Sequence, residues 1–272
     1  MTLPGGTADL VRSGFFAEKL SKPFLMRVAS IVVVLTAWQI AGQTKPTFLS
    51  SPSAIATAGW DLLVVDRRLL SAFGETLVGL GVGYAIAATL GIAVGFLMGR
   101  VRSIDIALLP YVNAMYATPR IALIPLLVLW VGIDFKLRVT IVILSSIFPI
   151  IITVRDGSKS VADRYLDLAR SFVATGWQTW RTAILPGSLP FMFAALRFGA
   201  QRAMIGVIVA EMTSSVAGTG RLILTYGRFF QTERLMVPVV IIGVFSILVT
   251  AFINYLQKLA TPWQKQSRGR AV

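Results

Sequence analysis

Six apolar runs, each close to the length that crosses a lipid bilayer, occupy most of this 272-residue chain. Hydrophobic residues make up 56% of the sequence, whereas soluble domains average roughly 45–50%. Only 14% of the residues are charged, against about 25% in soluble proteins. The sequence therefore predicts an all-α polytopic membrane protein with six transmembrane helices and little room for a soluble domain. The predicted spans cover residues 24–40, 72–98, 104–131, 139–154, 190–216 and 235–256.

The formal net charge is +14, and the distribution of Lys and Arg along the chain indicates which side of the membrane each segment faces. Basic residues lie at the ends of the apolar runs rather than on one face, which argues against nucleic-acid binding. With both termini in the cytoplasm, the inner segments hold 15 Lys and Arg residues and the outer segments hold eight. Because basic residues accumulate on the cytoplasmic side, we expect cytoplasmic tails at residues 1–23 and 258–272. The membrane domain between them spans residues 24–257.

The chain contains no Cys and no His. These absences remove thiol chemistry and the commonest metal ligands, and so argue against a metal-dependent intramembrane enzyme. No GxxxxGK[ST] motif is present to cradle ATP phosphates, so any ATP hydrolysis has to take place on a separate chain. The first apolar run lacks an A-x-A cleavage site, and we expect it to be a retained span rather than a signal peptide.

Residues 162–190 cannot lie in a bilayer, although long apolar runs flank them. An apolar stripe at three- and four-residue spacing predicts a first short helix in this loop. That stripe consists of Tyr165, Leu168, Ala169, Phe172 and Val173. The charged residues in the loop, each costly in hydrocarbon, are Asp163, Arg164, Asp167, Arg170 and Arg181.

The second half of the loop begins with residues 175–178 (TGWQ), which have the form of a capping box. Gly176 also suits a reversal of the chain. A second short helix over residues 177–184 is expected to end before Pro186, because proline disfavours helix at the preceding Leu185. Two short helices on the membrane surface would make a docking element. The alternative is a simple connector between two spans.

The loop resembles the cytoplasmic EAA loop of the membrane-spanning permease subunits of ATP-binding-cassette (ABC) importers. In that family the loop docks into a cleft on the ATPase subunit and transmits its opening and closing. The resemblance implies a type I ABC importer permease fold, in which residues 162–190 are the two-helix coupling loop. The resemblance assigns the coupling role to the following residues of this chain: Asp167, Ala169, Thr175, Gly176, Trp177, Ile184, Leu185 and Pro186.

Three positions depart from the family pattern of this loop. Asp167 stands where Glu is usual, which keeps the charge on a shorter stem. Leu168 stands where Ala is usual. Val173 stands where a glycine is expected, which leaves the local turn geometry open but not the identity of the loop.

Residues 118–126 (TPRIALIPL) resemble a segment of the nitrate, sulfonate, taurine and bicarbonate branch of these permeases. The branch implies an inner-membrane complex of two permeases, two ATPases and one extracytoplasmic solute-binding protein. The branch carries small anions, sulfonates and some heterocyclic nutrients, and Arg120 with the other positive span charges favours an anion. The resemblance also implies a homodimer of permeases, because this branch usually encodes one permease, and a pair of related permeases is the alternative. ATP and Mg²⁺ would bind to the partner ATPase, and no cofactor is expected in this chain.

The charged residues inside the predicted spans include Arg120, Arg197, Arg202 and Glu211. Ionised groups at membrane depth usually face protein or an aqueous path. These residues are therefore candidates for lining a translocation pathway, and structural pairing or snorkelling to water is the alternative. A second functional hypothesis is an ion- or proton-coupled secondary transporter that uses Glu211 and Glu75. No inverted repeat is evident in support of it.

Glycine is frequent in the second run, where Gly91 and Gly95 form a GxxxG pattern. Small residues let helices approach closely in lipid. We expect this face to pack within the subunit, and a contact with a second subunit is the alternative. Residues 214–233, between the last two runs, are expected to form an outer loop.

Overall fold

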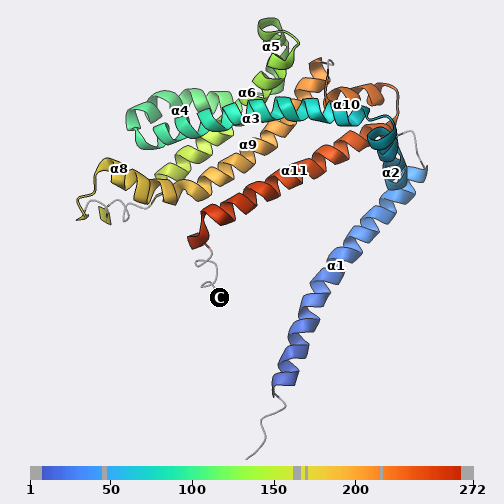
Figure 1. Ribbon diagram of the computed structural model, residues 1–272, viewed down its shortest axis with the longest axis horizontal. Coiled ribbons are helices and arrows are strands. Elements are labelled where there is room, and N and C mark those ends of the chain that lie inside the picture. The colour runs from blue at the N-terminus through green and yellow to red at the C-terminus, as the bar shows by residue number, and fades with distance from the viewer. Residues whose placement is uncertain (1–7, 45–47, 162–166, 169–170, 215–216, 265–272) are drawn as a thin grey trace, which may run out of the picture.

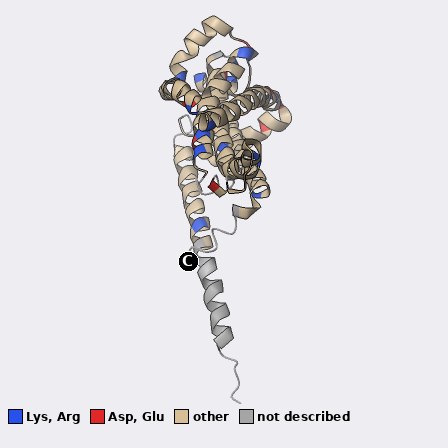
Figure 2. Ribbon diagram, turned by 90° about the vertical axis from the view of Figure 1, so that its left-hand side faces the viewer, with Lys and Arg blue, Asp and Glu red and all other residues tan. Residues whose placement is uncertain are grey.

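The computed structural model describes residues 8–44, 48–161, 167–168, 171–214 and 217–264. The regular elements over these ranges are all helices, as the predicted fold class requires. Charged residues are sparse along the ribbon (Figure 2). The α-helices are α1 (Ala8–Thr44), α2 (Pro52–Trp60), α3 (Arg68–Arg100), α4 (Arg102–Ala117), α5 (Ile124–Val131), α6 (Phe135–Lys159), α8 (Gly176–Thr179), α9 (Leu185–Ser214), α10 (Thr219–Arg228) and α11 (Thr232–Ala260). Two π-helical segments, η1 (Asp61–Val65) and η3 (Trp180–Ile184), and two 3₁₀ segments, η2 (Arg120–Leu123) and η4 (Pro262–Gln264), complete the described elements.

Within the described ranges, five helical segments are long and apolar enough to cross a membrane. Helix α4 and residues 120–131 are bent by 88° relative to each other, and together they make a sixth span if this bent pair is counted as one broken span. The bend falls at Pro119, whose predecessor Thr118 has an extended backbone, as expected before a proline. Pro110 lies inside α4 without ending it, and Pro125 occupies the first turn of α5. Of the three prolines in this run, only Pro119 therefore breaks the helix.

The centre of the bundle is α6, which packs against both α3 and α9 (Figure 1). Gly83 and Gly91 on α3 face α6 so closely that a Cβ on either would lie within 3 Å of the Val142 and Ile150 side chains. Gly95 and Gly99 approach α6 in the same way. The glycine face of α3 is therefore a packing surface within this chain, as predicted.

The bundle has two ends. The loop end holds the junction of α6 with α8, and the α10 end holds α10 and α2 (Figure 1). A buried apolar cluster joins α2, η1, α3, α10 and α11 at the α10 end, and its members include Leu62, Leu69, Tyr226 and Val237. Burial raises the pKa of the Tyr226 hydroxyl above its ordinary value. The prediction of an outer loop over 214–233 was incomplete, because this segment contains the ten-residue helix α10.

Helix α1 projects away from the bundle (Figure 1). Its final turns are held to the beginning of α2. Trp38 Nε1 donates to the carbonyl of Ser50, just before α2, at 2.9 Å, and Gln39 Nε2 donates to Ser53 Oγ in the first turn of α2 at 2.8 Å. The apolar 18-residue window within residues 24–44 contains no buried residue, whereas Gly42 near the end of the helix is buried against Ser51. The helix begins at Ala8, so it continues across the expected boundary between residues 23 and 24.

Helices extend beyond most of the apolar runs that predicted them. Helix α3 begins at Arg68, before residue 72, and α6 covers Phe135–Lys159 rather than residues 139–154. Hydropathy marks the part of a helix that suits hydrocarbon, whereas the helix itself continues as long as its backbone hydrogen bonds do.

Candidate coupling loop and charged span residues

The loop after α6 is described at residues 167–168 and from 171 onward. Most of the predicted first helix, including Ala169, lies outside the described residues. Asp167 and Leu168 are helical and exposed, and Asp167 accepts a hydrogen bond from Ser171 Oγ at its backbone carbonyl, at 2.9 Å. The second half of the loop is described in full.

The predicted capping box is present at the start of α8. Thr175 Oγ1 accepts a hydrogen bond from the Gln178 backbone N–H at 3.3 Å. The Gln178 side-chain oxygen in turn accepts one from the Thr175 N–H at 2.7 Å. Two of the free N–H groups at this helix start are thereby satisfied within the loop itself.

The chain reversal before α8 occurs at Val173 rather than at Gly176. Val173 has a φ of +54°, in the left-handed region that favours glycine. Gly176 is the first residue of α8 and has no such requirement. The position at which the resemblance led us to expect glycine therefore has glycine-like geometry, and this chain places a β-branched residue there.

The expectation that the second short helix ends before Pro186 was wrong. The π-helical segment η3 continues directly into α9, and Leu185 has helical dihedral angles. A proline has no N–H to donate and is tolerated in the first turn of a helix, and a π-helical turn is wider than an α-helical one. The consequence is mechanical, because residues 176–213 form one continuous helical segment that joins the loop to the membrane span.

Apolar side chains are exposed on this part of the loop. The exposed fractions are 77% for Phe172, 88% for Val173 and 66% for Trp177. The Trp177 and Trp180 rings stack with centroids 5.0 Å apart, which holds Trp177 on the surface. A contiguous apolar surface of this kind is typical of a site that a protein partner covers.

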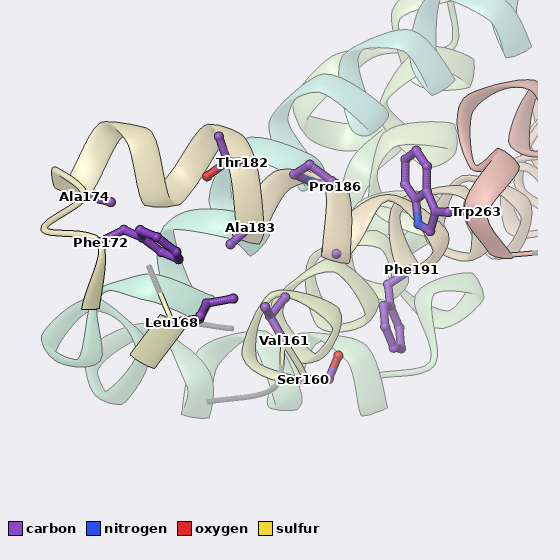
Figure 3. Close-up of a pocket in the computed structure, with 11 residues that line it drawn as sticks. Ser160, Val161, Leu168, Phe172, Ala174, Thr182, Ala183, Pro186, Phe191 and Trp263 are labelled. Atoms are coloured by element: carbon purple, nitrogen blue, oxygen red, sulfur yellow. The ribbon is translucent and has the colours of Figure 1, made fainter. Parts of the chain in front are cut away.

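A cavity of about 750 Å³ lies beneath the loop (Figure 3). Its walls come from four places: the end of α6, the first half of the loop, the beginning of α9 and the segment η4 near the C-terminus. The lining is mainly apolar and includes Val161, Leu168, Phe172, Pro186, Phe191 and Trp263. The loop is thus spaced from the bundle by a cavity on one side, while its other end is continuous with α9.

A buried ion-pair cluster that the sequence analysis did not identify lies beside the loop. Asp105, in the first turn of α4, accepts hydrogen bonds from Arg155 and Lys159 in the last turns of α6. Arg100 at the end of α3 donates to the Ser158 carbonyl of α6. These contacts join α3 and α4 to the end of α6 that leads into the loop. An acidic residue at the start of an apolar run was the available signal, since such a residue requires a partner.

Arg120 lies in η2, next to the bend of the broken span. Its Nη1 donates to the Ser145 carbonyl of α6 at 3.3 Å and its Nη2 to the Tyr116 carbonyl at 3.1 Å. The guanidinium carbon also lies 5.7 Å from the Tyr116 ring centroid and 5.8 Å from that of Phe148. Arg120 Nε is buried and has no hydrogen-bond partner among the described residues. The arginine is therefore held between α4 and α6 with part of its donor capacity unused.

Arg202 and Arg197 lie on α9 in different settings. Arg202 is exposed, makes no hydrogen bond or ion pair within the described part of the chain, and acts electrostatically on Arg120. Arg197 donates to Asn254 Oδ1 at 2.9 Å and also to Gln257, which ties α9 to α11. Two of the predicted pathway cations, Arg120 and Arg202, thus lie near each other, and Arg197 makes a structural contact.

Glu211 is fully buried near the end of α9. It accepts a hydrogen bond from Thr76 of α3 at 2.9 Å and one from the Gly220 N–H of α10 at 2.9 Å. Glu75, the other acid of the secondary-transporter hypothesis, is exposed, one residue before Thr76. The structure therefore places Glu211 at a junction of helices rather than on an exposed face.

Comparison with known proteins identifies the class to which this fold and loop belong. Residues 87–266 match the family model described as "Binding-protein-dependent transport system inner membrane component". The match covers more than half of the chain, and the chain belongs to this family of ABC importer permeases. It is a multi-pass inner-membrane transport subunit and not an enzyme. Such a system includes an ATPase and a solute-binding protein as partners.

Three relatives show the range of solutes in this family. The "Putative aliphatic sulfonates transport permease protein SsuC" of Escherichia coli (strain K12) is 30% identical over 251 residues, which are 89% of this chain and 94% of SsuC. The taurine transport system permease protein TauC of the same strain is 26% identical, over 90% of this chain and 91% of TauC. The nitrate import permease protein NrtB of Synechocystis sp. (strain PCC 6803) is 23% identical, over 93% of this chain and 94% of NrtB.

Proposed function

We propose that this chain pairs with a second copy of itself to form the translocation pathway for a small anionic solute. The solute is delivered by an extracytoplasmic binding protein, and residues 162–190 couple the pathway to a separate cytoplasmic ATPase. ATP and Mg²⁺ bind to that ATPase, and this chain contributes no residue to their chemistry. Both termini lie in the cytoplasm, in accordance with the excess of basic residues on that side.

The continuity of the loop with its spans supports the coupling role. Residues 176–213 form one helical segment, so a displacement of Trp177 is passed to α9 without an intervening flexible joint. The ion pairs of Asp105 attach α4 to the end of α6, on the other side of the loop. A force applied by the ATPase to the exposed apolar surface of residues 172–177 would therefore reach both α9 and the broken span.

The pair of cations near the bend supports an anionic solute. Arg202 has an exposed guanidinium on a membrane-spanning helix, which in hydrocarbon alone would be costly. Arg120 retains an unused buried donor nearby. An aqueous path along this face would satisfy both groups and favour negative charge. The names of the relatives refer to sulfonates, taurine and nitrate, whose sulfonate and nitrate groups are anionic.

Two uncovered surfaces support pairing with a second copy. Most apolar side chains of α1 before Trp38, including Phe24, Ile31 and Val33, are exposed in the described chain. The face of α9 that carries Phe198, Arg202 and Ile205 is also exposed. A second copy placed against these surfaces would cover α1 and enclose the Arg202 face as the wall of a shared pathway.

The test begins with gentle extraction of the native complex, intact mass measurement and identification of the co-purifying chains. We expect two copies of this permease and two of an ATPase. Reconstituted uptake with the cognate binding protein should then favour sulfonates, taurine or nitrate over a neutral formylaminopyrimidine. Arg202→Gln should reduce uptake of the anion, whereas Arg102→Gln, an exposed arginine at the loop end, should not. A homo-oligomer without ATPase, or uptake insensitive to Arg202→Gln, would contradict the corresponding part of the proposal.

A further inference from the structure

The carboxylate of Glu211 is the point at which four helices of the α10 end meet. Glu211 belongs to α9, and its Oε2 lies 2.9 Å from the Thr76 hydroxyl of α3. The same oxygen accepts from the Gly220 N–H of α10 at 2.9 Å. Its other oxygen, Oε1, lies 3.6 Å from Arg138 Nη1 of α6. A single buried side chain therefore contacts α3, α6 and α10 from α9.

Helix α10 has no cap of its own. Its N-cap residue is Gly218, which has no side chain that could accept from the free N–H groups of the first turn. The Glu211 carboxylate takes that position from a different helix, because it accepts from the Gly220 N–H in the first turn. A negative charge at this place is also favoured by the dipole of the ten-residue helix.

The segment from residue 218 to residue 220 is shaped around this carboxylate. Gly218 has a φ of +94°, and a Cβ there would overlap the Glu211 carboxylate. A Cβ on Gly220 would lie 2.6 Å from the Ile208 carbonyl oxygen. Between them, the Thr219 N–H donates to Thr76 Oγ1 at 2.9 Å. Both glycines are therefore required for the chain to approach Glu211 this closely.

The charge of Glu211 is balanced from α6. Arg138 extends along the Phe135 ring, with its guanidinium carbon 5.5 Å from the ring centroid. Its Nη1 and Glu211 Oε1 are both buried, and neither has a hydrogen-bond partner among the described residues. The pair faces one another at 3.6 Å, so each offsets the cost of burying the other.

We propose that Glu211 is a positioning residue that holds α10 in place by capping it from α9. The hydrogen bonds to Gly220 and Thr76 set where α10 lies on α3, and Arg138 of α6 faces the other carboxylate oxygen. This placement rests on the geometry of the chain alone. Its consequence for transport rests on the proposed function, because α10 lies at the end opposite the coupling loop, where the binding protein would dock.

The test measures the position of α10 directly. The chain contains no Cys, so spin labels can be attached at two introduced cysteines without background. One pair, Val78→Cys on α3 and Arg228→Cys on α10, reports on α10. A control pair, Leu90→Cys on α3 and Val244→Cys on α11, reports on the bundle. Distances are measured by double electron–electron resonance on the full-length complex in lipid nanodiscs, with singly labelled samples to identify distances between copies.

Glu211→Ala should broaden or shift the distance distribution of the α10 pair and leave that of the control pair unchanged. Glu211→Gln should have a smaller effect, because the amide oxygen can still accept from Gly220. A narrow, unshifted α10 distribution in Glu211→Ala would overturn the proposal.

A second route covers the case in which Glu211→Ala does not assemble. Gly218→Ala introduces a Cβ against the carboxylate and should displace α10 on its own. Thr76→Val removes one contact of the carboxylate and should broaden the α10 distribution more than Thr89→Val, whose hydroxyl contacts only its own helix. Equal, wild-type distributions in Gly218→Ala and Thr76→Val would overturn the proposal without any use of the Glu211 variants.

A functional measurement separates this inference from the proposed function. In the reconstituted complex, Glu211→Ala should lower the stimulation of ATP hydrolysis by the binding protein and leave the basal rate unchanged. A displaced α10 with normal stimulation would retain the positioning role and contradict docking at α10. A wild-type complex without any stimulation would contradict the proposed function and leave the distance measurements valid.

Discussion

At the α10 end, five elements close around a buried apolar cluster and four helices meet at the Glu211 carboxylate, whereas at the loop end apolar side chains remain exposed above a cavity. The first arrangement joins its elements through buried contacts, although Trp60, Phe229 and Phe230 of the same end remain exposed. The second leaves Phe172, Val173 and Trp177 in solvent. The difference is that the α10 end is held together by buried contacts between its own helices, whereas the exposed apolar side chains of the loop end lie above a cavity and are available to a partner.

The largest effect is expected at the loop end from Asp167→Arg. Reversing this charge on the docking surface should reduce transport to near background while ATP hydrolysis continues, because the two chains are no longer mechanically joined. Parallel measurements of solute uptake and phosphate release in proteoliposomes would show the loss of coupling. Ser171→Ala, a neutral change one helical turn later, serves as the control. Normal transport by Asp167→Arg would remove the basis for calling this the coupling end.

Leu62→Ala at the α10 end should lower the stability of the protein without uncoupling transport from ATP hydrolysis. Leu62 is 1% exposed in the apolar cluster, so the truncation leaves a cavity and should cost about 2–5 kcal/mol of stability. Thermal unfolding of the purified complex would measure this loss, with the more exposed Leu63→Ala as the control. Solute transported per ATP hydrolysed should stay unchanged in the folded fraction. A change in that ratio would show that the α10 end takes part in coupling.

Asp105→Ala addresses the connection between the loop end and the bundle. Removing the carboxylate takes away the partner of Lys159 and one of the two acidic partners of Arg155, and should cost about 1–3 kcal/mol. It should also reduce transport per ATP, because α4 is no longer attached to the end of α6. Asp156→Ala removes a more exposed partner of Arg155 and should have a smaller effect on both quantities. Equal effects of the two variants would show that the Asp105 cluster has no special role.

The smallest effect is expected from Val173→Gly, which should stabilise the loop. A β-branched residue in the left-handed region is strained by about 1–2 kcal/mol, and glycine removes this strain. The greater freedom of glycine in the unfolded chain offsets roughly 0.5–1 kcal/mol of the gain. Limited proteolysis of the loop should therefore slow slightly in Val173→Gly and not in Ala174→Gly. Faster cleavage of Val173→Gly would indicate that the strained valine is held by contacts of its own.

Several features of the site were predictable because they depend on neighbours in sequence. The capping box involves only residues 175–178, and its two hydrogen bonds connect residues three apart. The close-packing face of α3 follows from glycines spaced at helical periods. The end of the loop was mispredicted at Pro186, because the rule that a proline breaks the preceding helix does not include the π-helical turn of residues 180–184.

The partners of the buried charges were not predictable. Asp105 meets Arg155 across 50 residues, and Glu211 meets Thr76 across 135. Hydropathy shows that such charges need partners, but it gives no register between helices. The same limit applies to Arg197 and Arg202, which are five residues apart on one helix and have quite different surroundings.

The sequence by itself determined the membrane architecture, the location of the loop and its family resemblance, because hydrocarbon length, charge cost and local capping act along the chain. The tertiary structure alone decided which charges are structural and which are exposed, and that α10 is capped from α9. Those outcomes depend on how helices far apart in sequence are rotated and aligned. That alignment is set by close packing between α3, α6 and α9, and no local pattern specifies it.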